Sequence, residues 1–154
     1  MWRQKKIGSL AIVLLLASLL LMFRNAEPVN ASIASSDAEM IARGERLFAQ
    51  NCSPCHGQKA VGENTATPLG GWNKAGPIAP ALNGTGHAWH HPPRYFFHTI
   101  RNGSTMRGTR MIGWVGRMSD AEIVAVIAYF QSLWPPHIKD AYRQRFLHWV
   151  EKVK

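Results

Sequence analysis

The pattern of apolar and polar positions predicts four amphipathic helices after an N-terminal apolar run. In each, apolar residues recur every three or four positions, the period of a helix with one buried face. The first opens with Ser36 and carries Glu39 three residues later, a spacing typical of a capping box. The expected helices cover residues 36–51, 91–103, 119–134 and 137–154. Their buried faces should include Met40, Ile41, Gly44, Leu47 and Phe48, then Ile123, Val126, Ile127, Phe130 and Leu133, and finally Tyr142, Phe146, Trp149 and Val153.

Capping and helix-breaking residues set the limits of the later elements. Ser119 and Glu122 repeat the capping-box spacing, and Pro135 and Pro136 end that helix. Residues 57–79 are rich in Gly and Pro and predict a loop. Since no segment shows convincing strand alternation, we expect one small all-α domain over 36–136, followed by a basic amphipathic helix over 137–154.

The N-terminal 24 residues have a different composition. An uncharged, mainly apolar run from Ile7 to Phe23 follows three basic residues and is closed by Arg24. This is typical of a signal peptide or of a membrane anchor with its basic end inside. As a helix the run would span roughly 25 Å, slightly short of a hydrocarbon core of about 30 Å. We favour an uncleaved anchor over residues 1–24 and a linker over 25–35, with the domain outside the cytoplasmic membrane.

Cys52 and Cys55 are the only cysteines, and His56 follows them directly. A zinc site would require a second ligand pair, for which only His90 and His91 could be argued. A thioredoxin-type dithiol would follow a strand, whereas the residues before Cys52 predict a helix. A disulfide here would close too short a loop to stabilise a domain. Covalent haem attachment, with the histidine as iron ligand, uses all three residues.

These motifs occur in the order of a known family, and residues 36–136 resemble a monohaem class I cytochrome c. "GERLFAQNCSPCHG" is similar to the family's first helix and haem-binding motif, and Gly44 stands where the last helix, with Val126 and Tyr129, crosses it. "APALNGTG" is similar to the family's Pro-x-Leu stretch. The resemblance implies that the Pro80 carbonyl accepts the ring N–H of His56 and that Leu82 packs on the haem. Gly76 and Pro77 offer a second match to the family's Gly-Pro pair.

"TRMIGWVGRMSDAEI" resembles the segment that brings the axial methionine, with Ile112 where the family usually has proline. The resemblance implies Met111 as the sixth iron ligand and Trp114 near the haem. Met106 is the second candidate for the iron, and we expect Met118 in the core. A cluster of loop histidines could bind copper or replace methionine, although we favour a role in capping and flanking the helix that opens at Pro92; it consists of His87, His90 and His91.

An iron held by two axial ligands has no open site, so the resemblance implies an electron carrier and not an enzyme, at the periplasmic side of the membrane. The alternatives are a haem subunit of a respiratory complex, or a haem enzyme or gas-binding protein with an open sixth site. The net charge is +9, of which +6 lies beyond residue 31. This favours redox partners with an acidic docking face, or an anionic membrane surface, and we expect no nucleic acid. Arg107, Arg110 and Arg117 are the expected docking charges.

Overall fold

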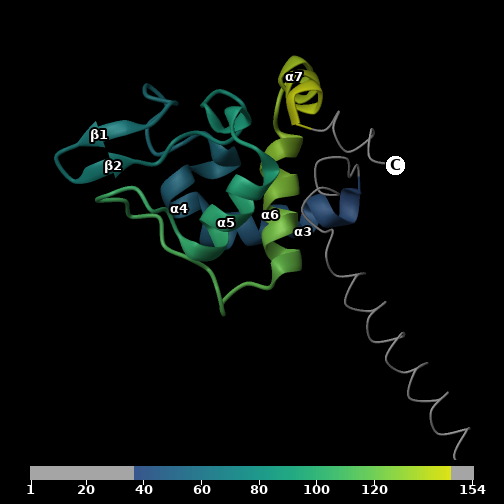
Figure 1. Ribbon diagram of the computed structural model, residues 1–154, viewed down its shortest axis with the longest axis horizontal. Helices are drawn as coiled ribbons and strands as arrows, with labels where there is room; N and C mark the ends of the chain where they lie inside the picture. The colour runs from purple at the N-terminus through teal and green to yellow at the C-terminus, as the bar shows by residue number, and fades with distance from the viewer. Residues whose placement is uncertain (1–36, 147–154) are drawn as a thin grey trace, which may run out of the picture.

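The computed structural model describes residues 37–146, a helical domain with one small hairpin (Figure 1). Two short 3-10 turns occur at Gln58–Ala60 and Ala88–His90. The α-helices are α3 (Ala38–Asn51), α4 (Ser53–His56), α5 (Pro93–Asn102), α6 (Asp120–Ser132) and α7 (Pro136–Phe146). Strands β1 (Gly71–Asn73) and β2 (Gly76–Ile78) pair antiparallel, with Trp72 opposite Pro77.

The crossing of α3 and α6 is the main helix contact of the fold, and Gly44 makes it possible. A Cβ atom at position 44 would lie 1.9 Å from the Ala125 carbonyl oxygen and 2.9 Å from the Tyr129 Cβ. One turn further along α3, the Phe48 ring meets the Tyr129 ring at a centroid distance of 5.3 Å. Only glycine lets the two backbones approach this closely, so the predicted crossing at Gly44 is present. Its nearest contacts are Tyr129, as predicted, and Ala125, where Val126 was expected.

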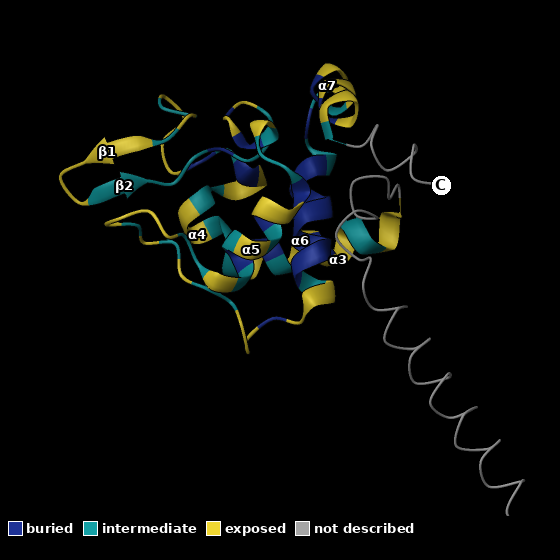
Figure 2. Cartoon of the chain, viewed as in Figure 1, coloured by how far each residue is buried: buried dark blue, intermediate teal, exposed yellow. Residues whose placement is uncertain are grey.

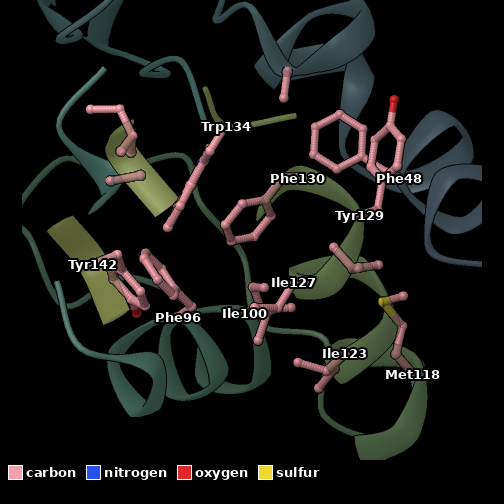
Figure 3. Close-up of a cluster of buried hydrophobic side chains, with 14 residues drawn as sticks. Phe48, Phe96, Ile100, Met118, Ile123, Ile127, Tyr129, Phe130, Trp134 and Tyr142 are labelled. Carbon is pink, nitrogen blue, oxygen red and sulfur yellow. The ribbon is translucent and has the colours of Figure 1, made fainter. Parts of the chain in front are cut away.

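Helix α6 forms the centre of the core, because every residue from Ile123 to Gln131 is buried (Figure 2). Its N-terminus confirms the predicted capping box: the Ser119 hydroxyl accepts from the Glu122 N–H, and the Glu122 carboxylate accepts from the Ser119 N–H. The predicted apolar face is only part of the buried surface of α6, because its other faces are buried as well. Figure 3 shows that aromatic and aliphatic side chains from α3, α5, α6 and α7 meet around this helix.

The C-terminal helix α7 packs against this core through Ile138 and Tyr142, both buried. The Tyr142 ring meets the Trp134 ring at 4.9 Å and the Phe96 ring at 6.4 Å between centroids (Figure 3). Pro136 begins this helix, in the position where a missing N–H costs no hydrogen bond. Of its predicted apolar face, Tyr142 is buried and Phe146 half-buried, while Trp149 and Val153 lie outside the described residues.

Two sequence predictions were wrong in detail. The domain is not all-α, because the predicted loop over 57–79 contains the β1–β2 hairpin, whose turn is closed by the Asn73 side chain accepting from the Ala75 N–H at 2.8 Å. The N-cap of α3 is Asp37, which accepts from the Glu39 N–H at 3.0 Å, and not Ser36. Among residues 37–146 no helix is long and apolar enough to cross a membrane; the predicted segment 1–24 lies outside this range.

Candidate functional site

The end of α3 runs directly into the turn that carries Cys52, Cys55 and His56. The Cys52 N–H donates to the Phe48 carbonyl at 2.9 Å, and the Cys52 carbonyl accepts from the N–H groups of Cys55 and His56, at 3.1 and 2.8 Å. Residues three and four apart on a helical turn share one face. Both cysteines are free thiols, Cys52 partly buried against the core and Cys55 exposed. The turn therefore presents two thiols and one imidazole together.

Burial, and to a smaller extent the neighbouring Cys55, raises the pKa of the Cys52 thiol to about 12. Dithiol oxidoreductases require the opposite, a thiolate stabilised at neutral pH. The Cys52 environment therefore disfavours the thioredoxin-type interpretation and suits a cysteine that becomes a neutral thioether.

The His56 ring is fixed by the loop opposite it. Its Nδ1 lies 2.9 Å from the carbonyl oxygen of Pro80, so Nδ1 must carry the proton that it donates. Desolvation by burial lowers the pKa of His56, although the Pro80 hydrogen bond and Glu63 oppose the shift, and the ring is therefore neutral at pH 7. A neutral imidazole with Nδ1 protonated has its lone pair on Nε2, which is the form that binds a metal.

The segment from Pro80 to Leu82 is held on both sides. The Ala81 N–H donates to Pro68 O at 2.9 Å, and the Leu82 N–H donates to Ala60 O at 2.8 Å. The Leu82 carbonyl accepts from the Trp134 indole N–H at 2.7 Å, and its side chain is half-buried against the core. Pro77, the alternative to Pro80, lies in β2, and its carbonyl accepts from Arg110.

Met111 lies near the end of a loop that leaves α5 and returns to it. At the base of this loop the Ser104 N–H donates to Met111 O at 3.2 Å, and the Trp114 N–H donates to both Ile100 O and Arg101 O at 3.0 Å. Gly103, with φ at +85°, is needed here because a Cβ would also lie 2.9 Å from Gly113 N. The side chains of Met111 and Trp114 are half-buried against the core cluster.

The two other methionines of this region have different environments. Met118 is buried, with 8% of its surface exposed, which confirms the prediction that it belongs to the core. Met106 is 54% exposed. Met111 is intermediate, as expected for a side chain at the edge of the core.

The histidines before α5 pack against aromatic rings. The His91 ring stacks on Tyr95 at 4.2 Å between centroids, and its edge contact with His87 measures 5.4 Å. The His90 ring lies 3.8 Å from that of Trp89. Within the described residues, no three His, Cys, Asp or Glu side chains are grouped so that they could hold a metal ion. These rings therefore flank the start of α5 as predicted, but the predicted capping is wrong, because no side chain caps this helix through a hydrogen bond.

Glu63 and Arg110 are positioned by contacts that sequence reasoning missed. Arg110, expected as a docking charge, donates to the Glu63 carboxylate at 2.6 Å, and both lie beside the candidate site residues. The pKa of Glu63 is lowered, chiefly by the Ala79 N–H and then by Arg110. The two residues are 47 positions apart, and no local pattern in the sequence pairs them.

These donors fit a haem iron. The thiols are unpaired, the imidazole is neutral with Nε2 available, and a thioether side chain lies half-buried in the same core cluster as Cys52 and Leu82. Nitrogen and thioether sulfur together are the axial donors of low-spin haem iron in electron-transfer proteins. The fold and this donor set define the class of c-type haem proteins.

Comparison with known proteins agrees. Residues 39–130 match the family model described as cytochrome c oxidase, cbb3-type, subunit III, and the chain belongs to this family. The predicted resemblance to c-type cytochromes is thereby confirmed, and with it a covalently bound haem c and a role in electron transfer. No solved structure matches the chain.

Proposed function

We propose that Cys52 and Cys55 form the thioether bonds to the haem and that His56 and Met111 are the axial ligands of its iron. The observation that carries the proposal is the hydrogen bond from His56 Nδ1 to Pro80 O, because it orients the ring and leaves Nε2 as the donor atom. When bound, the haem supplies a one-electron Fe(III)/Fe(II) couple. Addition of each S–H group across a vinyl double bond forms a thioether without any oxidant.

Burial supports Met111 over the other methionines. Met118 is committed to the core and Met106 is mostly exposed, whereas Met111 lies at the edge of the core beside Trp114. A neutral, soft thioether favours the reduced iron and raises the reduction potential relative to a second histidine. The half-buried apolar side chains of Leu82 and Trp114 would limit the access of water to this site.

A site closed by two protein ligands has no position for a substrate, so we infer that the protein transfers electrons without catalysing a reaction. The family suggests where: we propose that this chain is the haem subunit of a respiratory oxidase and passes electrons at the periplasmic face of the cytoplasmic membrane, anchored by residues 1–24. Arg107 and Arg117 are exposed and remain the proposed docking charges for an acidic partner face. Co-purification with an oxidase from detergent extracts, compared with a freely soluble haem-stained band, tests this placement.

The optical spectrum of the ferric protein tests the axial ligands. A methionine–iron bond leaves a weak far-red charge-transfer band, and we expect this band in the wild type and in Met106→Ala. Met111→Ala should lose the band, lower the potential and bind added cyanide readily. Loss of the band in Met106→Ala alone would transfer the role to Met106. A low-spin wild type without the band would point to one of the three loop histidines, and a high-spin wild type would favour the open-site alternative.

A further inference from the structure

The side chain of Arg110 joins the β1–β2 hairpin to the loop that carries Met111. Its guanidinium donates to the Glu63 carboxylate at 2.6 Å and to the Pro77 carbonyl at 3.1 Å. Glu63 is itself tied to Ala79: the Glu63 N–H donates to Ala79 O, and the Ala79 N–H donates to the Glu63 carboxylate, both at 3.0 Å. Both ends of the ion pair are thus also held by backbone groups.

The residues of this ion-pair network are adjacent in sequence to proposed site residues. Ala79 precedes Pro80, whose carbonyl fixes the His56 ring, and Arg110 precedes Met111. A single ion pair therefore connects the segment that orients one proposed axial ligand with the segment that carries the other. Most surface ion pairs join residues without such neighbours, and their contributions are small.

The hairpin makes a second contact with the same loop. A Cβ atom on Gly108 would lie 3.2 Å from the Trp72 ring, so this ring packs against the Gly108 backbone. In Figure 1 the hairpin lies beside the loop that follows α5. The base of the loop is fastened to α5 by backbone hydrogen bonds, while Trp72 contacts Gly108 and Glu63 contacts Arg110 within the loop.

We propose that the Glu63–Arg110 ion pair is a positioning device that keeps Met111 in its ligating position. The inference rests on the proposed function, since it requires Met111 to be an iron ligand. When the pair is broken, the loop should spend more time away from the iron, and added ligands should compete better for the sixth site. Neither residue binds the haem; both act through the neighbouring backbone.

A matched control separates this role from general stabilisation. The Arg43–Glu122 ion pair joins α3 to α6 at 3.1 Å, and its side chains are 50% and 28% exposed, against 46% and 31% for Arg110 and Glu63. Arg43→Gln therefore removes an ion pair of similar exposure at a place that touches neither proposed ligand. Arg110→Gln, Glu63→Gln and the double variant form a cycle that measures the coupling of the pair.

The test is the affinity of the purified ferric holoprotein for imidazole, together with its far-red band. We expect Arg110→Gln and Glu63→Gln each to bind imidazole about two- to fivefold more tightly, which is the range of an exposed ion pair. The double variant should add little to either single variant, and Arg43→Gln should match the wild type. Arg110→Lys should restore part of the wild-type affinity, because the ammonium keeps the charge opposite Glu63 but is a more strongly hydrated donor without the planar geometry of the guanidinium.

Equal imidazole affinity in Arg110→Gln, Arg43→Gln and the wild type would overturn the positioning role while leaving the proposed ligands intact. Additive effects in the double variant would also overturn it, because the two residues would then act independently. A wild type without the far-red band would contradict Met111 ligation itself, and the inference would fall with it. Far-UV circular dichroism of each variant verifies that the imidazole effect is measured on folded protein.

Discussion

The two proposed axial ligands are held by different kinds of structure. His56 lies on a helical turn continuous with α3, and its ring is fixed by one carbonyl of a segment that is itself hydrogen-bonded on both sides. Met111 lies in a loop whose ends meet at Gly103 and Gly113, and the neighbouring Arg110 contacts residues 33 and 47 positions earlier in the chain. One ligand is carried by a helical turn continuous with α3, and the other by a loop.

This difference predicts which side of the site opens first. Helical turns that pack on a core open only with the whole domain, whereas loops with few buried contacts open locally at low free-energy cost. The Met111 side should therefore exchange with added ligands while the His56 side stays intact. Substitutions on the His56 side and on the Met111 side should therefore differ in their effects.

The largest effect is expected from removing the helix-borne ligand. His56→Ala should lower the amount of holoprotein by at least about tenfold, since a primary ligand matters more than the outer residues whose loss costs about 10–100-fold in metal affinity. Met111→Ala should accumulate nearly as wild type, because the thioether bonds and His56 remain. Haem-stained gels of matched cell fractions provide the measurement. Equal yields from the two variants would remove the distinction between the sides.

The crossing of α3 and α6 at Gly44 should not tolerate even one added methyl group. Gly44→Ala would gain about 1 kcal/mol from helix propensity alone, but its Cβ would lie 1.9 Å from the Ala125 carbonyl oxygen. Overpacking costs typically about 1–3 kcal/mol and occasionally more, and we expect a net loss of about 2 kcal/mol in the free energy of unfolding by guanidinium.

The control for this clash is Ala42→Gly, on the exposed face of the same helix. It should cost about 1 kcal/mol through propensity alone. A Gly44→Ala protein as stable as wild type would show that α3 and α6 can separate without penalty, and the crossing would then not be what supports the Cys52–His56 turn.

The smallest effect is expected at Tyr142 in α7. The ring is buried, and its hydroxyl has no hydrogen-bond partner among the described residues. Replacing an unsatisfied polar group by an apolar one of the same shape is near neutral, so Tyr142→Phe should change the free energy of unfolding at pH 7 by less than about 1 kcal/mol. The far-red band should not change at all.

Alkaline pH should enlarge the difference in the free energy of unfolding between Tyr142→Phe and the wild type. Burial raises the pKa of Tyr142 above its ordinary value of about 10. Above that value the unfolded chain loses the phenol proton while the folded chain retains it, so the wild type loses stability as pH rises. Tyr142→Phe lacks this titration and should gain on the wild type above pH 10, as measured by denaturant unfolding. Parallel pH profiles would mean that the phenol is not buried in solution.

Much of this arrangement follows from the sequence because it is encoded locally. The Cys52–His56 turn, the capping box at Ser119 and the break after α6 each depend on residues within about five positions. Gly44 and Pro80 were identified through the resemblance to c-type cytochromes, and the contacts of both residues are present in the fold. Local signals and family motifs therefore account for the helices and for the His56 side.

The parts that sequence reasoning missed depend on contacts between distant residues. Strands β1 and β2 have three residues each, too few to show alternation, and an Asn73 turn holds them together. The burial of Tyr142 was predicted, but its ring partners Trp134 and Phe96 come from other elements and have no local signal in the sequence. The Glu63–Arg110 pair spans 47 positions, so neither charge indicates the other. The N-cap of α3 is Asp37 and not Ser36. Both residue types cap helices well and the two residues are adjacent, so the sequence did not distinguish them.

The central claim is that Cys52 and Cys55 attach one haem to this chain, and the intact mass of the protein after acid–organic extraction tests it most directly. This treatment removes haem that is not covalently bound. We predict that the wild-type polypeptide keeps the mass of one haem, that Cys52→Ala and Cys55→Ala keep at most one thioether and accumulate poorly, and that the double variant keeps none. A wild-type polypeptide that emerges at the mass of the bare chain, with the colour in the organic phase, would contradict the account.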